Sequence, residues 1–180
     1  LRLHPKSFQV HADRSQLQQI VTNLLVNAVD AVEGVEQSEI EIITRVAQID
    51  NGEFKQQLPQ GRYVMLQVKD NGRGMSVEER ERCFEPFFTS KSNKSSGVGF
   101  DGTGLGLSFS YSIAKQHGGV LTVKSQRGEG SIFTLYLPES DRKGQDVGRG
   151  RLDKPMGALS NPNYSSAVDA NLVLFDPHER

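Results

Sequence analysis

The chain has 180 residues and a net charge of −1, without a broad basic field, so we expect no nucleic-acid partner. Hydrophobic residues make up 36% and charged residues 24%, as in a soluble globular domain, and no run of about 18 apolar residues suggests a membrane span or direct membrane contact. The single Cys83 excludes an internal disulfide and a cysteine zinc site, and it favours a reducing compartment. The chain starts without Met and shows no signal peptide, so we expect a cytoplasmic piece of a longer protein, whose parent could be membrane-anchored.

A short strand over residues 7–13 and a long helix are expected first. Asp13 is a suitable N-cap for the helix, with Gln16 three residues on as its capping-box partner. Apolar residues then recur at steps of three and four, which is the period of an amphipathic helix. Gly34 is the expected end of this helix.

Four later stretches have the β-branched, alternating pattern of strands: 38–48, 62–70, 120–126 and 130–138. Asn51-Gly52 suggests a hairpin turn between the first two, and the last two are expected to form a closing antiparallel pair. Ser76 and Glu79 have the spacing of a capping box, which predicts a short helix over 77–83.

The last predicted helix begins at about Leu105 and ends before Gly118, a plausible residue just past a helix end. From Glu139 onward the sequence is polar, rich in glycine and proline, and lacks periodicity. We therefore predict one domain over residues 1–138 and a disordered tail or linker over 139–180. An apolar run near the end leaves open the truncated start of another domain.

The stretch "NLLVNAVD" places amide side chains on one ridge of the first helix. An amide oxygen such as that of Asn27 is a hard ligand suited to Mg²⁺, which proteins often hold through one side chain together with phosphates and water. Asn23 and Asn27 could equally lie on a solvated helix face. Asparagine is a poor helix former, however, so two of them one turn apart among apolar residues indicate a further role.

The stretch "DNGRGM" follows a predicted strand and contains Asn-Gly, which alone is typical of a plain turn. In a functional interpretation, the carboxylate of Asp70 accepts a hydrogen bond from the exocyclic amine of adenine. Guanine presents a carbonyl oxygen there and would be repelled. Gly72 and Gly74 would then let a flat base approach the backbone.

The stretch "GTGLGLS", residues 102–108, opens the last helix, where free N–H groups and the helix dipole favour an anion. It is not a dinucleotide fingerprint, because a polar loop rather than a strand precedes it. It is not a P-loop either, because Thr103 stands where that motif needs lysine.

Together, in this order, "NLLVNA", "DNGRG", "FEPFF", "GTGLGL" and "GEGSIFTLYLP" closely resemble the catalytic and ATP-binding domain of sensor histidine kinases, over roughly residues 7–138. The resemblance implies a Bergerat-type α/β two-layer sandwich, with a mixed sheet of about five strands and three helices. It implies transfer of the ATP γ-phosphoryl to a histidine on a separate dimerisation module, followed by transfer to a response regulator.

The resemblance also implies roles for single residues. Asn27 would bind the Mg²⁺ that bridges the phosphates of ATP, Asp70 would hold adenine, and Ser131 would support the base through water. Phe84, Phe87 and Phe88 would anchor a lid over residues 91–103, unless they are ordinary core residues. Leu107 would pack near the pocket. The phosphates would be held by residues of the second glycine box: Gly102, Thr103, Gly104, Leu105 and Gly106.

Asn23 separates this chain from ATPases of the wider superfamily, which carry a glutamate general base at this point of the motif. An amide cannot take a proton, so phosphoryl transfer is favoured over hydrolysis of ATP. The alternatives are an anti-sigma-type serine kinase or ATPase of the same fold, or a nucleotide-binding module without catalysis. A serine kinase is the hardest of these to exclude from the sequence.

The chain also departs from the family pattern. Many members carry Lys and then Tyr where this sequence has Asp30 and Ala31, so Asp30 takes a nucleotide-site position and Lys91 is a candidate for the γ-phosphate. "NAVDAV" instead resembles the nitrogen-regulatory branch of the family. No phosphoacceptor module is recognisable, since His178 lacks a helical context. We therefore expect a monomer here and a homodimer for the full-length protein.

Overall fold

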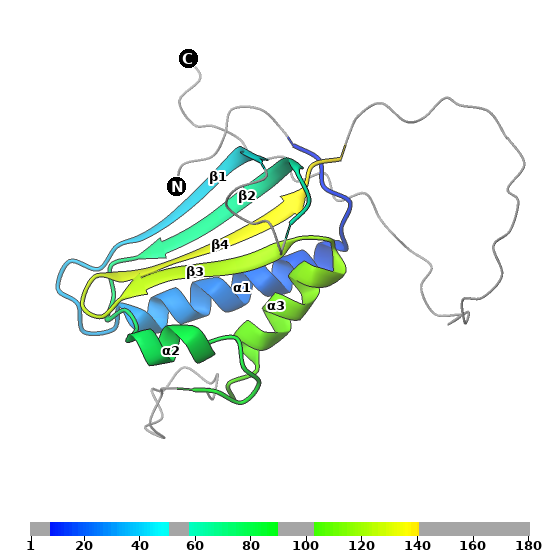
Figure 1. Ribbon diagram of the computed structural model, residues 1–180. Coiled ribbons are helices and arrows are strands. Elements are labelled where there is room, and N and C mark those ends of the chain that lie inside the picture. The colour runs from blue at the N-terminus through cyan, green and yellow to red at the C-terminus, as the bar shows by residue number, and fades with distance from the viewer. Residues whose placement is uncertain (1–7, 51–57, 90–102, 141–180) are drawn as a thin grey trace, which may run out of the picture.

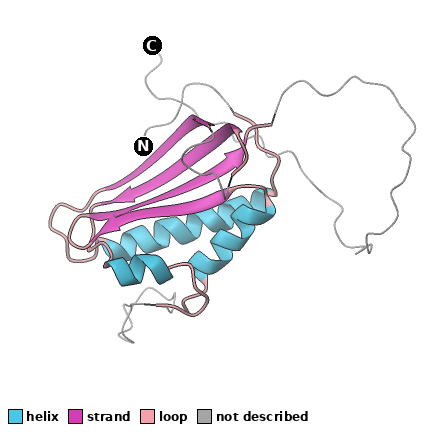
Figure 2. Ribbon diagram, in the orientation of Figure 1, coloured by secondary structure: helices cyan, strands magenta, loops and turns pink. Residues whose placement is uncertain are grey.

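The computed structural model describes residues 8–50, 58–89 and 103–140. Within them a four-stranded sheet has the order β1-β2-β4-β3, and every neighbouring pair is antiparallel. All three helices lie on one face of this sheet (Figures 1 and 2). The elements are α1 (Arg14–Ala31), β1 (Ile40–Ile49), β2 (Gly61–Asp70), α2 (Val77–Arg82), α3 (Gly106–Gln116), β3 (Val120–Gln126) and β4 (Gly130–Pro138). The predicted α/β two-layer architecture is confirmed.

The sheet differs in detail from the mixed, roughly five-stranded sheet that was expected. The described strands are all antiparallel, and the stretch expected as a first strand forms only an isolated antiparallel bridge between Val10 and Glu139. One further backbone hydrogen bond, from Ser140 N to Gln9 O at 2.8 Å, holds this segment past the end of β4. The chain turns into α1 too soon for more pairing. The expected Asn51-Gly52 turn and residues 141–180 lie outside the described residues.

The start of α1 is capped as predicted, although only half of the capping box forms. Asp13 Oδ1 accepts a hydrogen bond from Gln16 N at 2.9 Å. The Gln16 side chain does not return to the cap, since its Oε1 lies 2.7 Å from His117 Nε2 at the end of α3. A tertiary contact therefore replaces the local one.

The two long helices end differently with respect to their glycines. α3 ends as predicted, with His117 as its C-cap and Gly118 next in a left-handed conformation at φ +70°. α1 ends at Ala31, three residues before the expected Gly34, which has φ +80° in the following turn. This early end brings the Ala31 carbonyl to the loop that follows β2.

The core lies between the helices and the inner face of the sheet. α1 contributes a buried stripe with helical spacing: Leu17, Ile20, Leu24 and Ala28. Ile20 and Leu24 are 0% exposed, and full burial of such side chains contributes about 1.5–3 kcal/mol each. The stripe packs on sheet residues such as Val68 and Phe133. With this stripe facing the core, the asparagine ridge lies at its side. No helix of the described ranges is long and apolar enough to cross a membrane.

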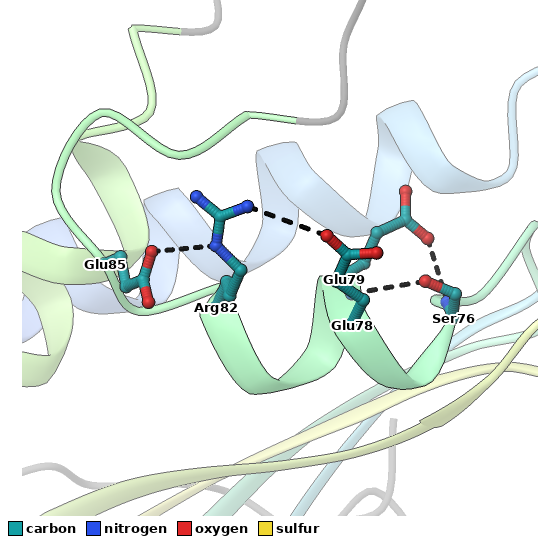
Figure 3. A network of polar contacts seen from close by, with 5 residues as sticks. All are labelled: Ser76, Glu78, Glu79, Arg82 and Glu85. Atoms are coloured by element: carbon teal, nitrogen blue, oxygen red, sulfur yellow. Dashed lines mark hydrogen bonds and ion pairs between the residues drawn. The ribbon is translucent and has the colours of Figure 1, made fainter.

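The predicted capping box of α2 is present in full. Ser76 N donates to Glu79 Oε2 at 2.8 Å, and Glu79 N donates to Ser76 Oγ at 3.2 Å (Figure 3). Arg82 forms ion pairs with Glu85 and, more loosely, with Glu78 on the exposed side. Because none of the residues of this short helix is buried, the helix depends on local interactions, and the capping box fixes its start.

Candidate nucleotide site

A pocket with a cavity volume of about 240 Å³ lies between α1, the start of α3 and the sheet. It collects residues that were predicted from four separate motifs: Asn23, Asn27, Asp70, Gly74, Thr103, Gly104, Gly106, Leu107 and Ser131. Asp30, Gly72 and Leu105 do not line it. Lys91 and Gly102 lie outside the described residues. The fold thus brings most of the predicted site together.

Asp70, at the end of β2, is the most deeply placed polar group of the pocket, at 2% exposed. Its Oδ1 accepts two backbone hydrogen bonds, from Gly72 N at 2.9 Å and from Ser131 N at 3.2 Å. Burial raises the pKa of Asp70, and these two hydrogen bonds act against that shift. No fully buried side-chain oxygen among the described residues lacks a partner, so the second oxygen, Oδ2, remains accessible from the pocket.

A serine pair supports the wall next to Asp70. Ser125 Oγ donates to Gly130 O at 2.9 Å, accepts from Met75 N at 2.9 Å, and lies 3.0 Å from Ser131 Oγ. Because Ser125 has one hydroxyl hydrogen and gives it to Gly130, Ser131 is the donor of the pair. Toward the pocket, Ser131 Oγ can therefore act only as a hydrogen-bond acceptor.

The glycines of "DNGRG" are required by the packing of the protein itself. A Cβ on Gly72 would lie 2.3 Å from the Ala31 carbonyl oxygen, and one on Gly74 would lie 1.9 Å from that of Gln126. Gly74 also has φ +60°, which disfavours other residues. This loop is therefore held between the end of α1 and the end of β3. The structure explains Gly72 by this contact, and its predicted place beside a base stays a prediction.

The two asparagines of the ridge differ in their surroundings. Asn23 Nδ2 donates to Gly106 O at 3.2 Å and to Ser110 Oγ at 3.1 Å, both on α3. Asn27 lines the pocket one turn further on, and no hydrogen bond from the described residues engages its amide. Asn23 therefore joins two helices, while Asn27 lines the pocket, and its predicted role as a ligand of Mg²⁺ stays a prediction.

The phenylalanines of "FEPFF" separate into three environments. Phe84 packs against the core, with its ring centroid 5.2 Å from that of Tyr111, which is ordinary core packing. Phe88 lines the pocket. Phe87 is 74% exposed, and its N–H donates to Gly104 O at 3.0 Å. The predicted lid over 91–103 lies almost wholly outside the described residues, so its anchoring stays a prediction.

Several lining residues were not identified from the sequence: Thr22, Val26, Ala31, Arg73, Met75, Glu79, Cys83, Thr89 and Phe133. Thr22 and Val26 flank the asparagine ridge and Ala31 continues it at helical spacing, so a helical projection could have identified them. Cys83 is buried, which raises the pKa of its thiol to about 11. No group of three or more His, Cys, Asp or Glu side chains within the described residues could hold a metal ion.

Comparisons with known proteins identify the family of this chain. Residues 12–141 match the family model described as histidine kinase-, DNA gyrase B- and HSP90-like ATPase, and the chain belongs to this family. It is 41% identical over 163 residues to the sensor kinase CckA of Brucella abortus (strain 2308), covering 88% of this chain and 16% of that protein. It is 34% identical over 130 residues to the sensor histidine kinase ZraS of Escherichia coli (strain K12), covering 72% and 23%.

Solved structures show the same fold. The catalytic domain of the histidine kinase ThkA, in a nucleotide-free form, is 27% identical with a TM-score of 0.56, over 77% of this chain and 76% of that one. A mycobacterial sensor histidine kinase, MprB, is 29% identical with a TM-score of 0.54, over 77% and 82%. The chain thus corresponds to most of a catalytic domain but to less than a quarter of the full-length relatives CckA and ZraS.

Proposed function

We propose that this chain is the ATP-binding catalytic domain of a sensor histidine kinase. It transfers the γ-phosphoryl of ATP to a histidine of a separate dimerisation module, in two-component signalling. The observation that carries this proposal is the buried carboxylate of Asp70, held by two backbone N–H groups at one end of a pocket whose other end meets the start of α3. The start of a helix favours anions, so the α3 end of the pocket suits the phosphates of ATP. A carboxylate oxygen accepts hydrogen bonds, so the Asp70 end suits the amine of adenine.

At the Asp70 end of the pocket, which would hold the base, Asp70 Oδ2 would accept a hydrogen bond from the exocyclic amine of adenine. The hydrogen bonds on Oδ1 fix the plane of the carboxylate and so fix where Oδ2 points. Guanine would bring a carbonyl oxygen against this acceptor and is selected against. The hydroxyl of Ser131, with its lone pairs available, suits a water bridge to the base.

At the phosphate end, Thr103, Gly104 and Gly106 line the pocket at the start of α3. Unpaired N–H groups of a helix start bind phosphate oxygens. The amide oxygen of Asn27 would be the protein ligand of Mg²⁺, whose charge would offset that of the triphosphate. This fits the pocket, because Asn27 has no other partner among the described residues and no carboxylate cluster competes for the metal there.

The hydrogen bonds that Asn23 donates favour phosphoryl transfer over hydrolysis of ATP. Its Nδ2 is bound to α3, and its amide has no basic atom, so it cannot activate water. Asp30 is the single acidic residue of α1, and it does not line the pocket. α1 therefore supplies no general base. The residues position ATP, and the acceptor histidine would come from the partner module.

The partners follow from this role. The chain would act on the dimerisation and phosphoacceptor module of its own parent protein, which passes the phosphoryl to a response regulator. The parent would be a homodimer with its kinase domains in the cytoplasm, and this chain alone a monomer. The likeness of "NAVDAV" to the nitrogen-regulatory branch belongs to the same proposal.

Calorimetry tests this proposal, with Mg²⁺ and ATP or ADP, and hydrolysis followed in the same sample. We expect the wild-type chain to bind both nucleotides with almost no turnover, and Asp70→Asn to bind at least about tenfold more weakly, because the amide presents a donor to the adenine amine. Gln67→Glu, a change on the opposite face of the same strand, is the control. Fast turnover would instead indicate an ATPase, and equal binding by Asp70→Asn would contradict the adenine role of Asp70.

A further inference from the structure

Arg73 is the one cationic residue among the described residues that line the pocket. It stands between the two glycines of "DNGRG", and its backbone is fixed on both sides. Arg73 N donates to Ala31 O at 2.9 Å, and Gly128 N donates to Arg73 O at 2.8 Å. The base of this side chain is thus tied to the end of α1 and to the β3–β4 turn.

The position of Arg73 along α1 decides which part of a nucleotide it meets. Asn23, Asn27 and Ala31 follow one another at four-residue steps, so they lie on one ridge. Asn23 contacts the start of α3, which is the phosphate end of the pocket, and Ala31 contacts Arg73. Eight residues of helix separate these two points, which is about 12 Å at a rise of 1.5 Å per residue. Arg73 therefore starts at the base end, beside Asp70.

At the Asp70 end of the pocket, one wall near Arg73 is formed by a small side chain. Ala31 offers only a methyl group there, while Met75 and Phe133 give the pocket larger apolar walls. A guanidinium is planar, weakly hydrated for a cation, and stacks well on an aromatic face. None of the causes that shift the pKa of Asp70 involves this guanidinium, so the carboxylate stays available to the base amine.

We propose that the Arg73 guanidinium covers the face of the adenine ring whose edge is held by Asp70, and that it contributes affinity for the base and not for the phosphates. This inference rests on the proposed function. It adds an affinity-determining residue to the site, at a position whose backbone is fixed by hydrogen bonds to Ala31 and Gly128.

The test compares adenosine, ADP and ATP binding to wild type, Arg73→Met and Arg73→Lys by calorimetry. Arg73→Met keeps the stem and removes the cation. We expect Arg73→Met to weaken the binding of all three ligands by the same factor, roughly five- to tenfold. Arg73→Lys should recover part of this lost affinity. Arg127→Ala, which removes an exposed arginine from the adjacent β3–β4 turn, is the matched control and should bind as wild type. Circular dichroism verifies that each variant is folded.

Three results would overturn the inference. A loss that grows from adenosine to ATP would assign Arg73 to the phosphates. Unchanged binding of every ligand by Arg73→Met would show that the guanidinium does not touch the nucleotide, while leaving the proposed function intact. A wild-type chain that bound none of the three would remove the proposed function and this inference together.

Discussion

Asn23 Nδ2 donates a hydrogen bond to the carbonyl oxygen of Gly106 at 3.2 Å, across 83 positions of sequence. A second bond from the same nitrogen reaches Ser110 Oγ at 3.1 Å. The side chain of Asn23 therefore connects α1 to the first turn of α3. This connection fixes the start of α3 at one end of the pocket, and the next prediction depends on it.

Replacing Asn23 by aspartate should destabilise the fold. The carboxylate cannot donate, so both hydrogen bonds to α3 are lost, and a charge is placed beside the Gly106 carbonyl oxygen. We expect the free energy of unfolding to fall by about 1–3 kcal/mol, measured by urea denaturation at pH 7. Gln19→Glu makes the same amide-to-acid change on the exposed side of α1 and should have little effect. Equal losses in both variants would contradict the role of Asn23 as a connection between helices.

Asp70→Asn should raise stability at neutral pH although it weakens binding. Burial raises the pKa of Asp70 in the folded chain above its value in the unfolded chain. The raised pKa therefore stabilises the folded wild-type chain at pH values below the pKa of Asp70 in the unfolded chain. This stabilisation is lost as the pH rises through the pKa of Asp70 in the folded chain. Asparagine mimics the protonated acid and can still accept on Oδ1 from Gly72 and Ser131. We expect the variant to be the more stable one at pH 7.

The measurement is urea unfolding of wild type and Asp70→Asn from pH 3.5 to pH 7. The difference in free energy of unfolding should vanish at the acid end and grow with pH. Asp50→Asn makes the same change at an exposed acid next to β1 and is the matched control. A difference that is independent of pH would mean that the burial of Asp70 does not control its titration.

Gly128 and Gly130, in the turn and at the start of β4, form a matched pair. Both have positive φ, at +83° and +88°. A Cβ on Gly128 meets nothing within 4 Å, while one on Gly130 would lie 2.0 Å from the Asp70 carbonyl oxygen. We expect Gly128→Ala to cost about 1–2 kcal/mol from backbone strain alone. Gly130→Ala should cost about 3 kcal/mol or more, because overpacking adds to the strain. Equal costs in urea denaturation would contradict this close approach.

The thiol of Cys83 should react slowly while the chain is folded. Burial raises the pKa of Cys83 to about 11, and its Sγ donates to Arg80 O at 3.2 Å. At pH 8 the thiolate fraction is then roughly a hundredfold smaller than for a thiol of pKa near 9. We expect iodoacetamide labelling, followed by mass spectrometry, to be at least that much slower in the folded chain than in urea. Fast labelling of the folded chain would show that this wall of the pocket opens readily.

Local sequence signals predicted the elements well where the partners are close in sequence. The Ser76 and Glu79 capping box forms in full because its two residues meet within one helical turn. The corresponding box at Asp13 forms by half, because Gln16 contacts His117, 101 positions away, and no local pattern shows that contact. The early end of α1 at Ala31 has a similar cause, since the Ala31 carbonyl accepts from Arg73 N.

The site was predictable as a set of motifs and less so as single roles. Asp70, Asn27 and the start of α3 meet in one pocket as expected. Gly72 is instead required by the backbone of Ala31, a contact between distant segments that a motif does not contain. Arg73 stands between the two glycines of "DNGRG", where the motif assigned no role, and only its position in the pocket selects it.

The most direct test of the central claim is phosphoryl transfer to the helical phosphoacceptor module of the parent protein, produced separately and mixed with this chain and ATP labelled on the γ-phosphate. With the wild-type chain we expect label on a histidine of the module, stable in base and lost in acid. With Asp70→Asn we expect much less label. Label on serine, which is stable in acid, would identify a serine kinase. Release of free phosphate without labelled module would contradict the account in favour of an ATPase, and bound ATP with neither product would leave a binding module without catalysis.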